Sequence, residues 1–185
     1  MDEVRKEFGS RVSAGMTLLD IGCGPGHDSA FWTKKGLKTV GIDVSQKTVA
    51  VAQGRYPALE FQVLDLMDLG KLHAKFDAAW MAYSLLHITR SSAADALRAV
   101  RSSMKANGIF FVETPIMDLT NEEVRPIAGL KDEAGREIKV PYTAWAVDDL
   151  TALLSSSFVV EWSKVYDPLP GRPRSWSAIL RPHRF

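Results

Sequence analysis

The chain has 185 residues, a length that suits one domain with a hydrophobic core of its own. Its composition is 46% hydrophobic and 24% charged, which excludes disordered, collagen-like and disulfide-dense proteins. The 23 basic side chains nearly balance the 22 acidic ones, and the net charge of +1 argues against nucleic acid as the main partner.

Cysteine, histidine and apolar residues restrict the function further. The single cysteine, Cys23, cannot form an internal disulfide, and the four histidines have no spacing typical of a zinc site. The longest segment without a charged residue, Ala78–Thr89, has 12 residues, whereas a membrane span needs about 18. The amino terminus does not resemble a signal peptide. We expect a cytoplasmic protein with no metal and no membrane span.

Short apolar segments alternate with helical patterns through the first two thirds of the chain. The expected strands are Thr17–Ile21, Lys38–Ile42, Leu59–Leu64, Phe76–Met81 and Ile109–Glu113. The expected helices run over residues 27–35, from the capping residue Ser45 to Gln53, and from Ser91 or Ser92 to the turn Asn107-Gly108. Because helices separate the strands, the strands should be parallel, with helices on both faces of the sheet. The predicted fold class is α/β, doubly wound.

The pattern changes after the fifth strand. The 28 residues Thr114–Pro141 are predicted to be an insertion on the substrate side of a single domain, 1–185, because inserted loops often carry specificity. A helix is expected to begin at Asp148-Asp149. The segments Phe158–Trp162 and Ser175–Leu180 are predicted to form a terminal antiparallel pair.

The clearest motif is the glycine loop after the first strand, Leu18-Leu19-Asp20-Ile21-Gly22-Cys23-Gly24-Pro25-Gly26. Alternate glycines allow a tight turn and a close approach of backbone to ligand. A dinucleotide fingerprint would place its third glycine at His27, but here Gly26 completes Gly-x-Gly-x-Gly. At this point the chain resembles the class I S-adenosylmethionine-dependent methyltransferases of the small-molecule type, whose first motif is an apolar strand, an acidic residue and this glycine pattern.

The resemblance extends from Thr17 to Leu180. It implies a mostly parallel seven-stranded sheet of order 3-2-1-4-5-7-6, with the last strand antiparallel. It also implies S-adenosylmethionine as cofactor, S-adenosylhomocysteine as product, and direct displacement by a small-molecule acceptor. Only 16 residues precede the first strand, where such enzymes often carry a longer helical cap. That difference implies an open site, a lid from a second copy in a homodimer, or a missing cap.

The same resemblance assigns cofactor-binding residues. Asp43, 17 positions after Gly26, would accept both ribose hydroxyls, and Asp65 would accept from the adenine amino group. The alternative for each is a capping or turn aspartate. The other implied cofactor contacts are Asp20, Gly22, Cys23, Gly24 and Gly26 around the methionine arm, Val44 and the backbone N–H of Leu66 at the adenine, and Ala82 at the ammonium. For Cys23 and Val44 the alternative is ordinary packing.

Candidate catalytic and substrate residues follow the fourth strand and end the insertion. His87, in the segment Ser84-Leu85-Leu86-His87, is the candidate general base, and a structural histidine bonded to backbone is the alternative. Tyr83 is a candidate substrate contact that could instead satisfy the strand end. Tyr142 and Trp145 are candidate walls of a substrate pocket, with core packing as the alternative.

Several methyltransferase types lack their required residues here. Ala82-Tyr83-Ser84-Leu85 stands where enzymes acting on DNA amines carry Asn-Pro-Pro-Tyr, and the one cysteine is not placed to attack cytosine. The fourth strand ends Trp80-Met81 without a metal-binding aspartate. The sequence therefore predicts a metal-independent methyltransferase acting on a small molecule. The alternatives are a protein- or RNA-modifying methyltransferase, an NAD-binding oxidoreductase and a catalytically silent nucleotide-binding module.

Overall fold

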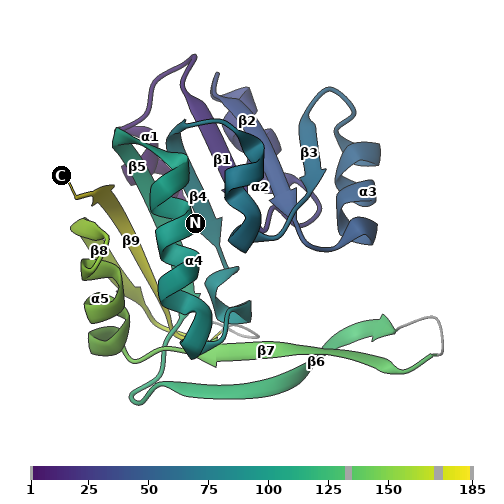
Figure 1. Ribbon diagram of the computed structural model, residues 1–185, viewed down its shortest axis with the longest axis vertical. Helices are drawn as coiled ribbons and strands as arrows, with labels where there is room; N and C mark the ends of the chain where they lie inside the picture. Colours follow the sequence, from purple (N-terminus) through teal and green to yellow (C-terminus); the bar gives the residue numbers. More distant parts are fainter. Residues whose placement is uncertain (1, 132–134, 169–172, 184–185) are drawn as a thin grey trace.

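The computed structural model describes residues 2–131, 135–168 and 173–183 (Figure 1). Its main sheet has seven strands in the order β3-β2-β1-β4-β5-β9-β8. The strands are β1 (Thr17–Ile21), β2 (Lys38–Asp43), β3 (Glu60–Val63), β4 (Phe76–Ala82), β5 (Met104–Pro115), β8 (Phe158–Tyr166) and β9 (Ser175–Pro182). The first five strands are parallel, and β9 is antiparallel to both β5 and β8. The predicted fold class and strand order are confirmed.

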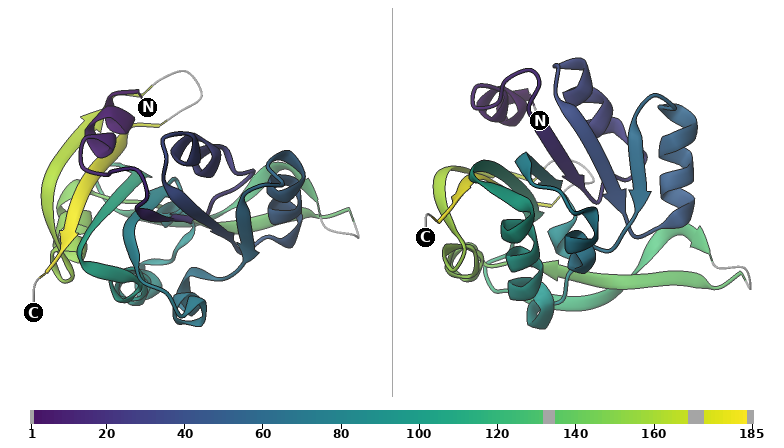
Figure 2. Two further views of the ribbon diagram at one scale, coloured as in Figure 1. Left: turned by 90° about the horizontal axis from the view of Figure 1, so that it is seen from above. Right: turned by 45° about the horizontal axis from the view of Figure 1, so that its top comes forward.

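Helices cover both faces of this sheet (Figure 2). They are α1 (Asp2–Gly9), α2 (His27–Lys34), α3 (Gln46–Arg55), α4 (Arg90–Ser103) and α5 (Val147–Ser155), with the 3-10 turns η1 (Leu66–Leu72) and η2 (Leu85–His87). One core contains α4, α5 and η1, and the core on the opposite face contains α1 and α2. No helix in the described part of the chain is long and apolar enough to cross a membrane.

Two helix starts test the capping predictions. Ser45 caps α3 as predicted, because its side chain accepts from the Thr48 N–H at 3.3 Å. The predicted start of α4 at Ser91 or Ser92 is wrong: α4 begins at Arg90, and Thr89 is its N-cap residue. Thr89 donates its hydroxyl proton to Ser92 Oγ at 3.1 Å, and its hydroxyl oxygen also lies 3.1 Å from Ser91 Oγ.

The helix α1 was not predicted, and aromatic side chains hold it in place. Phe8 is fully buried, and its ring centroid lies 5.0 Å from those of both Trp32 and Trp80. Trp80 in turn stacks on Phe111 at 3.9 Å. The short amino-terminal segment therefore belongs to the core on this face of the sheet.

The segment between β5 and α5 forms an antiparallel ribbon of two strands, β6 (Asn121–Lys131) and β7 (Glu137–Ala144). The ribbon is a separate sheet and runs along the carboxyl-terminal edge of the main one (Figure 1). The sequence indicated an insertion here but no strands, because Pro126 and Pro141 interrupt the pattern of a regular strand. Residues 132–134 of the insertion lie outside the described residues.

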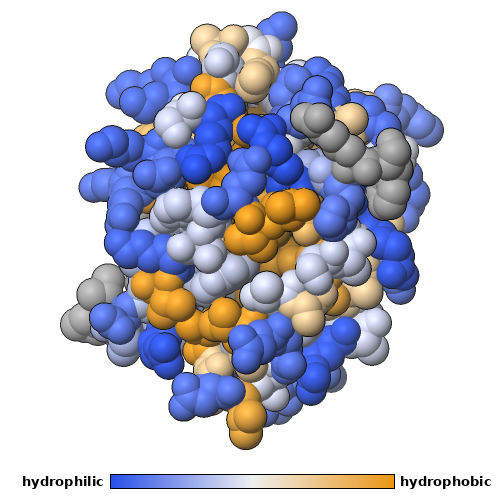
Figure 3. Space-filling model, turned by 90° about the vertical axis from the view of Figure 1, so that its left-hand side faces the viewer, coloured by the Kyte–Doolittle hydropathy of each residue, from blue (hydrophilic) through white to orange (hydrophobic). Residues whose placement is uncertain are grey.

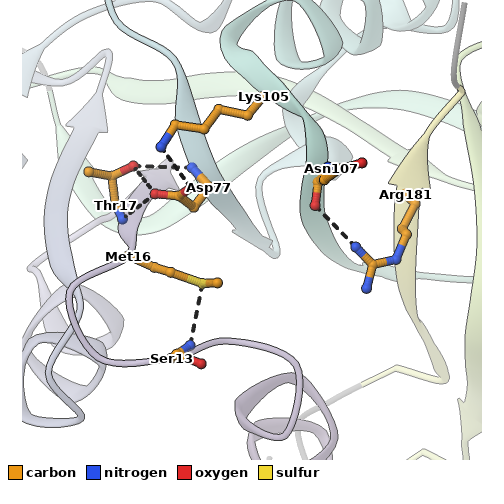
Figure 4. Close-up of polar contacts among 7 residues, drawn as sticks. All are labelled: Ser13, Met16, Thr17, Asp77, Lys105, Asn107 and Arg181. Atoms are coloured by element: carbon orange, nitrogen blue, oxygen red, sulfur yellow. Dashed lines mark hydrogen bonds and ion pairs between the residues drawn. The ribbon is translucent and has the colours of Figure 1, made fainter.

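The opposite, amino-terminal edge carries a cavity of about 410 Å³ between the starts of β1, β4 and β5 and the end of β9. Asp77 accepts from the Thr17 N–H and hydroxyl, each at 2.9 Å, and from Lys105 Nζ at 2.7 Å (Figure 4). Arg181 donates to the Asn107 carbonyl at 3.1 Å. These bonds join neighbouring strands at the edge that lies away from the glycine loop.

Candidate functional site

The glycine loop has a backbone that only glycine adopts without strain. Gly22, Gly24 and Gly26 have φ values of +68°, +53° and +85°. A Cβ at Gly22 would lie 2.1 Å from Ser84 Oγ, and one at Gly26 would lie 2.7 Å from the Phe61 ring. A Cβ at Gly24 would meet no atom within 4 Å. Packing therefore requires two of the glycines, whereas the third borders open space at the carboxyl edge.

Asp43 holds this loop from the end of β2. Its Oδ2 accepts from the Gly24 N–H at 3.1 Å, and its Oδ1 accepts from the Ser45 N–H at 2.8 Å. The side chain is only partly buried. A carboxylate can accept further hydrogen bonds, so Asp43 still has the capacity to accept ribose hydroxyls.

Asp20 is placed differently from a residue in direct contact with a ligand. It is 2% exposed, and its Oδ2 accepts from the hydroxyl of Ser29, on α2, at 2.6 Å. Burial raises the pKa of Asp20 to about 7, although the Ser29 bond opposes this shift. Asp20 thus connects β1 to the helix that follows the glycine loop.

Cys23 packs inside the loop. It is 7% exposed and shares a small core with Val49, Ala52 and Phe61. Burial, together with the nearby carboxylates of Asp20 and Asp43, raises the pKa of the thiol far above its usual range. The burial favours the packing alternative, and the raised pKa means that the thiol is not activated as a nucleophile.

Apolar side chains are exposed at the carboxyl ends of β2 and β3. Val44, Val63 and Met67 are 71%, 52% and 46% exposed. Asp43 pairs with Val63 in the strand register, so these side chains lie at one edge. Val63 and Met67 were not predicted, although apolar residues on both sides of Asp65 were a visible signal. Together they offer a surface for a flat apolar ring.

Asp65 lies within this group as the N-cap residue of η1. Its Oδ1 accepts from the Met67 N–H at 2.8 Å, which is the turn contact of the alternative interpretation. Leu66 is 8% exposed and packs in the core, so its side chain is not available to a ligand. The adenine roles of Asp65 and of the Leu66 N–H stay predictions.

The end of β4 is strained. Tyr83, directly after Ala82, has φ +55°, and its N–H donates to the Glu113 carbonyl at 2.9 Å. Ser84 donates to the Ile21 carbonyl at 2.8 Å, which joins the ends of β4 and β1 under the glycine loop. A left-handed backbone at a non-glycine residue is typical of functional loops. Ala82 and Tyr83 thus lie where the sequence placed them, and their contacts with ligands stay predictions.

His87 is exposed and contacts the ribbon. Its Nδ1 lies 3.1 Å from the carbonyl oxygen of Pro141, in β7. A carbonyl only accepts, so Nδ1 carries the proton in this contact, and Nε2 of the neutral ring is left as an acceptor. The contact matches the structural alternative, and it also orients the ring for a base at Nε2.

The two aromatic candidates at the end of the insertion have different surroundings. Tyr142 lies opposite Glu123 in the ribbon, and the Arg125 guanidinium lies 3.9 Å from its ring centroid. The neighbouring Thr143 is fully buried and donates to the Ile88 carbonyl at 2.9 Å. Since successive strand residues point to opposite faces, Tyr142 points away from η2 and α4.

Trp145 is 3% exposed and belongs to the main core. Its burial favours the core-packing alternative for Trp145. Tyr142 packs against Arg125 on the ribbon, and its substrate role stays a prediction. Val124, which is 66% exposed, shares the ribbon face of Thr143 and was missed. Its position depends on the strand register, which the sequence pattern did not show.

Acidic, histidine and cysteine side chains do not gather into a metal site within the part of the chain that the structure describes. The sequence prediction of a metal-independent enzyme stays a prediction.

Comparison with known proteins gives a consistent family. Residues 18–108 match a methyltransferase domain family. An O-methyltransferase of Pyrenophora dematioidea is 36% identical over 91 residues, which are 45% of this chain and 34% of the relative. The chain thus covers about a third of the length of the first curated relatives that it matches.

Solved structures share the fold over nearly the whole chain. An S-adenosylmethionine-dependent methyltransferase of Clostridium acetobutylicum superposes with a TM-score of 0.76 at 14% identity, covering 99% of this chain and 90% of that one. The 1,6-didemethyltoxoflavin-N1-methyltransferase of Burkholderia thailandensis, solved with its namesake compound and S-adenosylhomocysteine, superposes with a TM-score of 0.74 at 17% identity, covering 99% and 76%. Residues 18–108, with the glycine loop near their start, thus belong to a methyltransferase domain family, and the chain has the fold of solved S-adenosylmethionine-dependent methyltransferases.

Proposed function

We propose that this chain transfers a methyl group from S-adenosylmethionine to a small-molecule acceptor by direct displacement. The observation that carries the proposal is the glycine loop, with Asp43 bonded to the Gly24 N–H beside open space. A dinucleotide-binding loop would have its third glycine one position later. The solved relative with bound S-adenosylhomocysteine supports the cofactor assignment.

The residues at the carboxyl edge fit the parts of this cofactor. The open space at Gly24 admits the methionine arm, and the carboxylate of Asp43 suits a ribose with two hydroxyls. The exposed side chains of Val44, Val63 and Met67 suit the faces of an adenine ring. We assign Asp20 an indirect role, because it holds α2 through Ser29.

Methyl transfer by direct displacement requires no covalent intermediate with the chain. When bound, S-adenosylmethionine supplies a methyl group that its sulfonium already activates. The chain has to hold the acceptor in line with that methyl group and exclude water, an effect that can contribute about 7–11 kcal/mol. In the neutral ring of His87, Nε2 carries no proton and can accept one. His87 is therefore our candidate base, which would remove a proton from a hydroxyl or ammonium group of the molecule to be methylated.

A small-molecule acceptor is supported by the near-neutral charge and by the position of the ribbon. The net charge of +1 gives little attraction for nucleic acid. The ribbon runs along the carboxyl-terminal edge, close to the end of β4 (Figure 1). A cytoplasmic location without a resident metal is part of the same proposal, and the single cysteine supports it.

Calorimetry of the purified chain with S-adenosylmethionine, S-adenosylhomocysteine and NAD tests the proposal. We expect micromolar-scale binding of the first two and none of NAD. The variant Gly24→Ala should lose binding, because its Cβ enters the space proposed for the cofactor. The matched control is Gly15→Ala, before β1, where φ is +87° and a Cβ also meets nothing within 4 Å, so that backbone strain is the same kind but the proposed site is untouched. Binding of NAD alone would replace this function with the oxidoreductase alternative.

A further inference from the structure

Within the residues that the structure describes, the main sheet ends on one short and one long edge strand. Its end strands are β3, with four residues, and β8, with nine. On β8 the side chains of Val159 and Val165 are 50% and 40% exposed. Figure 3 shows this side of the molecule, where apolar patches lie among hydrophilic residues. A long edge strand presents unpaired N–H and C=O groups and is a template for another strand.

A bulge divides β8 into two halves. The pairing with β9 shifts between Val160 and Trp162, so Glu161 is the extra residue. Before the bulge, Val160 packs against the core of α4 and α5; after it, Trp162 and Tyr166 pack against the core of α1. The regular strand β9 pairs with both halves because Glu161 and Trp162 together occupy one position of the register.

A second β8, laid antiparallel with Ser163 opposite its own copy, also matches both halves when the bulge is counted in the same way. If the bulge pair Glu161-Trp162 counts as one position, that pair faces Lys164 of the other copy. Outside it, Val160 faces Val165, and Val159 faces Tyr166. Each pair then lies on one face of the sheet, as directly opposed residues must. The edge is therefore self-complementary in both charge and hydrophobicity.

We propose that two copies of this chain associate through β8, edge to edge, about a two-fold axis at Ser163, and so form one continuous sheet. A two-fold contact repeats each pair, so every dimer has two Glu161–Lys164 contacts and two Val160–Val165 contacts. The interface lies at the opposite end of the sheet from β2 and β3 and leaves the cofactor residues accessible. It does not depend on the proposed function.

Contacts within the chain already hold the charged side chains at this edge. Glu161 accepts from Arg181 Nε at 2.5 Å, and Lys164 donates to both carboxylate oxygens of Glu3 at 2.8 and 2.7 Å. Carboxylate and ammonium groups can each make further hydrogen bonds. The side chains are thus restrained before association, which lowers the entropy cost of pairing them across the axis.

Charge exchange tests the proposal by sedimentation velocity of the full chain. We expect the wild-type chain to form a dimer. Lys164→Glu and Glu161→Lys should each raise the dimer dissociation constant by at least about tenfold, because like charges then face each other twice. An equimolar mixture of the two variants should dimerise again, since the acidic pair of one variant faces the lysine pair of the other. Effects within one chain cannot produce this recovery.

Val165→Lys should also weaken the dimer, and the matched control is Val51→Lys, at an exposed valine on α3. Either a wild-type chain that stays monomeric at about 100 µM or a mixture that stays monomeric would overturn the proposal. So would a dimer that is unchanged in all three β8 variants, because association would then use another surface.

Discussion

At the scale of single residues, Asp43 combines a structural role with the proposed ligand role. Its two oxygens already accept from the backbone of the glycine loop and of Ser45. We expect Asp43→Ala to weaken S-adenosylhomocysteine binding by about 2–4 kcal/mol, because the ribose hydroxyls lose their acceptor and the loop loses its restraint. Asp43→Asn keeps one acceptor oxygen and should lose less. Calorimetry of both variants measures the difference.

The control for this experiment is Asp68→Ala, at an exposed aspartate that is paired with Lys71 on η1. It should bind like the wild-type chain. Unchanged affinity in Asp43→Ala would remove Asp43 from the cofactor site.

Asp20 gives a pH dependence of stability with a definite sign. Its ordinary pKa is 3.8, and burial raises the folded-state value to about 7. Between these values the folded chain holds a proton that the unfolded chain has released, so this contribution to stability is lost as pH rises. From pH 5 to pH 8 the free energy of unfolding of the wild-type chain should fall by roughly 2–3 kcal/mol relative to that of Asp20→Asn. Urea unfolding at each pH measures it.

Asp77→Asn is the matched control for this pH series. Burial alone would raise the pKa of Asp77, but bonds from Lys105 and Thr17 outweigh it and lower the pKa. The stabilisation that ionised Asp77 provides is lost only in acid. The difference in the free energy of unfolding between the wild-type chain and Asp77→Asn should therefore be constant from pH 5 to pH 8. A similarly flat difference for Asp20→Asn would contradict the raised pKa.

At the scale of elements, His87 and Thr143 both tie the ribbon to the body of the protein. Thr143→Val removes one of these bonds and leaves the imidazole untouched. If His87 is a base, His87→Ala should depress methyl transfer at saturating cofactor at least about a hundredfold, whereas Thr143→Val should change it little. Equal losses in the two variants would mean that His87 acts only by holding the ribbon.

The helix α1 depends on Phe8, which is fully buried against Trp32 and Trp80. We expect Phe8→Ala to lower the free energy of unfolding by about 3–5 kcal/mol, because it leaves a cavity in a rigid aromatic cluster. Val12→Ala, at a partly buried residue beside the same core, is the milder control. Denaturant unfolding measures both, and a loss of less than about 1 kcal/mol for Phe8→Ala would show that α1 contributes little.

At the scale of the whole molecule, ligand binding should stabilise the fold by mass action. S-adenosylhomocysteine at a hundred times its dissociation constant should add about 2.7 kcal/mol to the free energy of unfolding. For a chain of this size, that gain raises Tm by roughly 5–10 °C. Differential scanning fluorimetry measures the shift. Gly24→Ala should show none, and an equal shift in that variant would place the ligand elsewhere.

The sequence by itself determined the main sheet and the glycine loop. Alternating apolar strands and helices predict a parallel sheet, since such strands cannot pair as hairpins. Gly22, Gly24 and Gly26 are recognisable because their backbone angles are a local requirement. Asp43 and Asp65 were placed at the correct edge because parallel strands share their carboxyl end. All of these inferences depend on neighbours in the chain.

Only the tertiary structure decided what distant residues do to each other. The bond from Ser29 to Asp20, the docking of α1 through Phe8 and the burial of Trp145 depend on packing between elements. Tyr142 and Thr143 are adjacent in sequence, yet the strand pairing sends their side chains to opposite faces. The self-complementary edge of β8 likewise exists only because a bulge sets the phase of its two halves, and a bulge is visible only against a paired strand.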